Sequence, residues 1–128
     1  MRLAKQDRTK ARTHLARDRE LAERLPLFLR SVAEAERALD EARDRGAPVE
    51  EVHDRGVELD EALTEAMRAA YAQERVLVGV KGYGDRIQRR KRLARPEVKQ
   101  ATQVAERLLT ARETHRLHGI PGVPRPVG

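Results

Sequence analysis

The sequence has 128 residues, the size of one ordinary domain, and its 27 Lys and Arg outnumber its 21 Asp and Glu, giving a net charge of +6 at neutral pH. Leu, Ile, Val and Phe together make up 28 residues, about 22% of the chain, so only a thin hydrophobic core is expected. The absence of Cys and Trp excludes disulfide scaffolds, Cys-zinc sites and thiol catalysis, and two Tyr and one Phe leave almost no aromatic platform for stacking on bases.

Residues 1–25 are predicted to form a basic helical arm. The apolar stripe of this segment is sparse and consists of Ala4, Ala11, Leu15, Ala22 and Leu25. Because a residue that precedes proline is disfavoured in α conformation, Leu25-Pro26 predicts a kink or turn and an arm that stands partly off the body. Five cations near the start of the arm are candidate partner contacts: Arg2, Lys5, Arg8, Lys10 and Arg12.

Residues 26–78 are predicted to form an acidic antiparallel helix hairpin. The first helix is expected over about 27–45, on the stripe Phe28, Val32, Ala35, Leu39 and Ala42. Gly46 suits a left-handed C-cap, and Pro48 with Glu50 and Glu51 suits the start of the next helix. That helix should run for about 30 residues, on the stripe Val49, Val52, Gly56, Leu59, Leu63, Ala66, Ala70 and Leu77. A close helix crossing near Gly56 is expected to offset the poor helix propensity of glycine.

Residues 79–119 are predicted to contain a Gly-rich joint, a short basic helix and a last helix. Asp85 can cap the short helix, which should end near Leu93. Pro96 suits the start of the last helix and Gly119 its end. The face of this last helix is expected to comprise Val98, Ala101, Ala105, Leu108, Arg112 and His115.

Residues 120–128 are predicted to form an extended tail, because three prolines remove backbone donors and restrict φ. The candidate docking groups of this tail are its aliphatic side chains, Ile120, Val123 and Val127. The complete expectation is an all-α, single-domain helical bundle built on the hairpin of residues 26–78, with an N-terminal helical arm and an extended C-terminal tail.

The strongest functional pattern is a run of cations without an acid inside the predicted short helix. Such a cluster can neutralise phosphates of DNA or RNA, or dock on an acidic protein surface of the same or a neighbouring copy. A merely solvated helix is the third alternative. The candidate binding residues are Arg86, Arg89, Arg90, Lys91, Arg92, Arg95 and Lys99.

Charge is divided unevenly along the chain. Residues 1–25 carry a net +4, residues 26–80 a net −6 and residues 81–128 a net +8. An acidic middle between basic ends can fold back on itself or join the middle of one copy to the ends of another. The alternative is three solvated faces, since exposed ion pairs are individually weak.

Other motifs point to no catalytic residue, cofactor or metal. Gly79–Asp85 lacks the Gly-Lys-Ser/Thr ending of a phosphate-binding P-loop, so it is interpreted as a flexible joint. His115 and His118 are explained by the dipole at a helix C-terminus rather than by a metal site. The carboxylate pairs Glu50/Glu51 and Asp60/Glu61 are interpreted as solvated helix charges, and Ser31 is the only serine.

These features favour a non-enzymatic structural subunit of a homo-oligomeric ring or larger particle, since subunit contacts would supplement a thin core. The predicted architecture is similar in general form to small all-helical connector proteins of viral head-to-tail junctions. This analogy rests on architecture alone, and no sequence motif supports it. The alternative is a helical protein that binds the nucleic-acid phosphate backbone through residues 86–99. No membrane association or secretory signal peptide is expected, which favours a location in the cytoplasm or within a virus particle.

Overall fold

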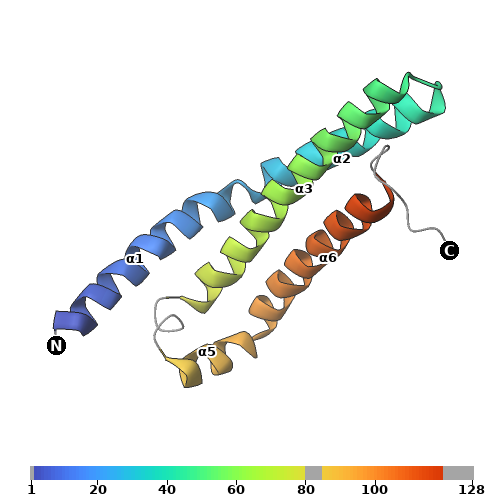
Figure 1. Ribbon diagram of the computed structural model, residues 1–128. Coiled ribbons are helices and arrows are strands. Elements are labelled where there is room, and N and C mark those ends of the chain that lie inside the picture. Colours follow the sequence, from blue (N-terminus) through green and yellow to red (C-terminus); the bar gives the residue numbers. More distant parts are fainter. Residues whose placement is uncertain (1, 80–84, 120–128) are drawn as a thin grey trace. The chain divides into compact units, whose positions relative to one another are not determined.

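The computed structural model describes residues 2–79 and 85–119, and their side chains from residue 5 onward (Figure 1). These residues form helices and no strand, which confirms the all-α class. The helices are α1 (Arg2–Glu23), α2 (Leu25–Asp44), α3 (Val49–Val78), α5 (Arg86–Leu93) and α6 (Pro96–His118). The predicted extended tail and most of the predicted Gly-rich joint lie outside the described residues.

The chain divides into two compact units, each assembled from two stretches that are distant in the sequence. Unit 1 comprises Met1–Leu25 and Arg68–Glu106, and unit 2 comprises Pro26–Met67 and Arg107–Gly128. The segments predicted from the sequence are consecutive, whereas α3 and α6 each contribute to both units.

The core of unit 1 is built mainly from alanine. Ala69, Ala70 and Ala72 of α3 are at most 1% exposed, and Val98 and Ala105 of α6 are fully buried. The predicted stripe of α3 contained Ala70 but neither Ala69 nor Ala72. A prediction from one apolar stripe assumes that the helix packs against one partner. Ala69 and Ala72 were missed because this part of α3 is buried on more than one side.

Helix α1 buries more of its surface than its sparse stripe predicted. Leu15 and Ala22 are buried, and between them Asp18 is only 9% exposed. Asp18 accepts two hydrogen bonds from Arg75 of α3, at 2.9 Å from Nε and 3.0 Å from Nη2. A buried carboxylate is tolerated in a core when it is paired in this way. The second half of α1 is therefore part of the packed body of unit 1.

The junction between the first two helices is a short turn, as the sequence predicted. Arg24 alone separates α1 from α2, and its backbone N–H donates to the carbonyl of Leu21 at 3.1 Å. Pro26 occupies the second position of α2. The N–H groups of the first turn of a helix have no intrahelical acceptor, so a proline costs no hydrogen bond there.

In unit 2, the turn after α2 has the geometry that the sequence predicted. Gly46 has a φ of +66°. The N–H of Ala47 donates to the carbonyl of Ala42 at 2.9 Å, and that of Gly46 to Arg43 at 3.1 Å. This pair of bonds is a Schellman motif, which satisfies carbonyls at the end of a helix. Arg45 then forms an ion pair with Glu51 in the first turn of α3.

The buried face of unit 2 follows the predicted stripes closely. The buried apolar residues are Val32, Leu39, Ala42, Leu59, Leu63, Ala66 and Leu108. The expectation for Val49 was wrong, because this side chain is 72% exposed. Val49 is the first residue of α3, and its neighbours Pro48 and Glu50 are exposed as well, so the helix begins on the surface.

Candidate functional site

Charge is divided between the two compact units. Unit 1 contains 18 Lys and Arg against 8 Asp and Glu, a net charge of +10. Unit 2 contains 9 against 13, a net charge of −4. The two predicted basic segments, at residues 1–25 and 86–99, belong to the same unit although about 60 residues separate them in the sequence.

Helix α5 carries most of the predicted binding cations on an exposed surface. Asp85 caps the helix, and its side chain accepts from the N–H groups of Ile87 and Gln88 at 2.9 and 3.3 Å. None of the residues of α5 is buried. No carboxylate in the described part of the chain pairs with the exposed cations in and after this helix, which are Arg86, Arg89, Arg90, Lys91, Arg95 and Lys99.

Arg92 differs from the other cations of this group. It is only partly exposed, and its Nη1 donates to the carbonyl of Val78, the last residue of α3, at 2.9 Å. Gly79 follows with a φ of +78°, and a Cβ placed there would lie 3.1 Å from Arg92 Nη1. Arg92 was predicted as a binding cation like its neighbours, but its guanidinium caps the end of α3 in a confined space.

The N-terminal cations form a second exposed group on α1. Lys5, Arg8, Lys10 and Arg12 all lie on its surface. The side chain of Arg2 lies outside the described part of the structure, as do the predicted tail contacts Ile120, Val123 and Val127. The structure thus places the two basic groups in unit 1 but on different helices.

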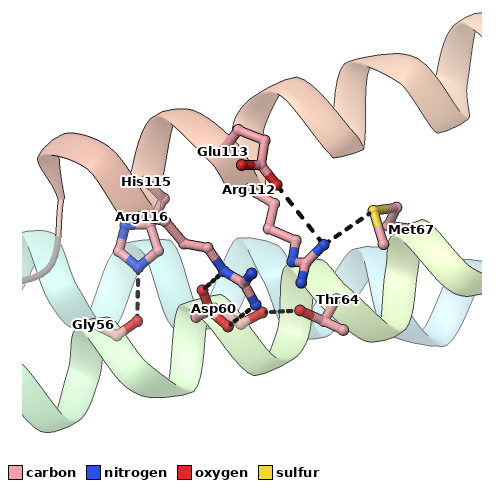
Figure 2. Close-up of polar contacts among 8 residues, drawn as sticks. All are labelled: Gly56, Asp60, Thr64, Met67, Arg112, Glu113, His115 and Arg116. Atoms are coloured by element: carbon pink, nitrogen blue, oxygen red, sulfur yellow. Dashed lines mark hydrogen bonds and ion pairs between the residues drawn. The ribbon is translucent and has the colours of Figure 1, made fainter.

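Polar side chains of α6 contact α3 within unit 2 (Figure 2). Arg116 donates to both carboxylate oxygens of Asp60, at 2.6 Å from Nε and 3.2 Å from Nη2. This hydrogen bonding is the main cause that lowers the pKa of Asp60 below its ordinary value, while desolvation opposes it. Asp60 is therefore a paired, half-buried carboxylate, and its interpretation as a solvated charge was wrong.

His115 lies one residue before Arg116 and is only 8% exposed. One ring nitrogen, Nε2, lies 2.7 Å from the carbonyl oxygen of the buried Gly56, which fits an N–H donor at that nitrogen. The contact recorded at Gly56 is thus made by an imidazole ring, and the close helix crossing expected there stays a prediction. The side chain of His115 is buried, as its place on the predicted face of the last helix indicated, whereas the helix-dipole interpretation did not predict its contact with Gly56.

Arg112 lies one turn earlier in α6 and is incompletely satisfied. Its Nη1 is 3.8 Å from Met67 Sδ and 3.9 Å from Glu113 Oε1 (Figure 2), both weak contacts. Its buried Nε has no acceptor among the described residues. Sequence reasoning placed Arg112 on the buried face but predicted no partner for it.

Within residues 5–79 and 85–119, no three His, Asp or Glu side chains are placed to hold a metal ion. None of the helices in the described ranges is long and apolar enough to cross a membrane.

Comparison of the chain with protein families, curated proteins and solved structures finds no match.

Proposed function

We propose that this protein is a non-enzymatic structural subunit of a homo-oligomeric ring or larger particle, of the kind found at viral head-to-tail junctions. In this proposal α2 and the first part of α3 form the antiparallel hairpin on which the subunit is built. The tail of residues 120–128 attaches to a neighbouring copy.

The observation that carries the proposal is the contrast between a small core and large exposed apolar side chains. Among the described residues, half of the sixteen buried apolar residues are alanine. Leu27, Val49 and Leu117 of unit 2, by contrast, are 53%, 72% and 58% exposed. Burying a leucine or valine side chain contributes about 1.5–3 kcal/mol, so contacts between copies would add burial that a single copy lacks.

The test is to make these exposed positions charged and to measure the mass in solution. The variant L27K/L117K should associate more weakly than the wild type, because a charge in an apolar contact is costly to desolvate. Substituting lysine at the exposed Ala33 and Ala111 is the matched control and should leave association unchanged. Light scattering that finds the wild type monomeric at every concentration would refute the proposal.

The second candidate function is binding to the phosphate backbone of DNA or RNA through residues 86–99. The specific observation that favours it is the exposed group of α5 cations without carboxylate partners in the described structure. Binding of this kind weakens steeply with salt, because each neutralised phosphate releases counterions. Titration of the monomeric protein with a short DNA duplex at several salt concentrations would measure that slope, and the absence of binding at low salt would exclude the candidate.

A further inference from the structure

Helix α5 has a surface that no described residue of the chain covers. It has eight residues, none of them buried, although isolated helices of this length are marginal in water. Among the described residues, it is held by the Asp85 cap at its start and by the contact of Arg92 with Val78. Such a helix would gain stability from a partner that covers its exposed face.

The exposed face of α5 combines one apolar group with several cations. Ile87 is 67% exposed. Arg90 and Lys91 follow it by three and four residues, so they lie beside it on the helix surface, and Arg86 precedes it directly. A partner suited to this face would offer an apolar group surrounded by carboxylates.

Helix α3 presents that pattern within unit 2. Val57 is 36% exposed. Asp54 precedes it by three residues and Glu61 follows it by four, so both carboxylates flank it on the same face. Asp54 and Glu61 are exposed, and neither forms an ion pair among the described residues. Glu58, also exposed on this face, pairs with Arg55 at 2.7 Å.

We infer that α5 of one copy docks on this face of α3 in a second copy, with Ile87 against Val57 and the Arg90 and Lys91 cations facing Asp54 and Glu61. The inference rests on the proposed function and adds a second contact to the one proposed at Leu27 and Leu117. A protein face fits better than a phosphate backbone, because a phosphate backbone offers no apolar surface to Ile87. The positive unit 1 and the negative unit 2 also favour attraction between copies.

The geometry of this contact determines the type of assembly. The two surfaces differ, so the contact is head-to-tail, and each copy carries one surface of each kind. Head-to-tail contacts close into rings or extend as open chains. The contact should form faster and more tightly at low salt, since its charged groups are exposed and screened by ions.

A charge-swap experiment tests the inference. The variants R90E/K91E and D54R/E61R each place like charges in the contact, and each alone should raise the dissociation constant by at least about tenfold. An equimolar mixture of the two variants should regain association, because acidic α5 then meets basic α3 and basic α5 meets acidic α3. Ile87→Ser and Val57→Ser should also weaken association, whereas the matched control R17E/R19E, at exposed positions of α1 outside the predicted contact residues, should not.

Each contrary result has a distinct meaning. A wild type that stays monomeric overturns both the proposed function and this inference. Association that persists unchanged in both charge variants overturns the inference alone. If the charge variants change the melting temperature but not the mass in solution, the contact lies within a single chain and the inference is overturned. Loss of binding to a short DNA duplex in R90E/K91E, with its mass unchanged, assigns α5 to phosphate binding and overturns it as well.

Discussion

Arg92 donates a hydrogen bond from Nη1 to the carbonyl oxygen of Val78 at 2.9 Å, so a side chain of α5 caps the end of α3. The last carbonyls of a helix have no intrahelical partner, and a cationic donor also interacts favourably with the negative end of the helix dipole. This contact ties α5 to unit 1 although no residue of α5 is buried.

The first prediction concerns this cap. Arg92→Ala should lower the free energy of unfolding by about 1.5–3 kcal/mol, the range for a hydrogen bond to a charged group. Arg90→Ala is the matched control, since Arg90 is exposed and should change stability by less than about 0.5 kcal/mol. Urea unfolding followed by circular dichroism measures both. Equal effects of the two substitutions would show that the Val78 contact contributes nothing.

The second prediction concerns backbone conformation at Gly46. Gly46→Ala should cost roughly 1–2 kcal/mol, because a residue with a Cβ is strained at positive φ. An added Cβ would meet no atom within 4 Å, so the loss should come from the backbone alone. Gly46→Asn should cost less, since asparagine tolerates this conformation better. Thermal unfolding of the three proteins should rank them glycine, asparagine, alanine in falling stability, and any other order would contradict the assignment.

The third prediction concerns the alanine-rich core of unit 1. Ala69→Leu and Ala105→Leu insert bulk at positions that are fully buried. Overpacking of this kind typically costs about 1–3 kcal/mol. The same substitution at the exposed Ala33 should be nearly neutral. If Ala69→Leu unfolds at the same urea concentration as the wild type, α3 is not packed closely at that position.

The fourth prediction concerns pH and the Asp60–Arg116 pair. Because pairing lowers the pKa of Asp60 in the folded state, the pair stabilises the fold fully above the ordinary pKa of 3.8. That contribution is lost as the pH falls from there through the lower pKa of the folded state. Asp60→Asn should therefore be less stable than the wild type at neutral pH, and the gap should shrink in acid.

Urea midpoints of both proteins between neutral pH and pH 3 test this expectation, with the exposed Glu61→Gln as control. A gap between the wild type and Asp60→Asn that stays constant down to the lowest pH would show that the ionised pair is not its source.

Local rules were sufficient to predict much of the fold. The Gly46 turn, the Asp85 cap and the start of α6 at Pro96 each depend on residues within a few positions of one another. The buried face of α6 was also predicted, since Val98, Ala101, Ala105 and Leu108 follow one helical stripe.

Contacts between distant residues could not be predicted from the same rules. Asp18 lies 57 residues from Arg75, and nothing local distinguishes it from a solvated carboxylate. Arg92 is likewise one cation among several in the sequence. Only its contact with the carbonyl of Val78 distinguishes it from Arg90. The division of charge between the two units could not be predicted either, because each unit joins two stretches that are distant in the sequence.

The central claim is that copies of this chain assemble with one another, and the mass of the nuclease-treated wild type in solution tests it most directly. Light scattering over a range of concentrations at low salt should give masses that are multiples of the 14.5 kDa chain and that fall as salt is raised. A single mass of 14.5 kDa at every concentration and salt would contradict the claim.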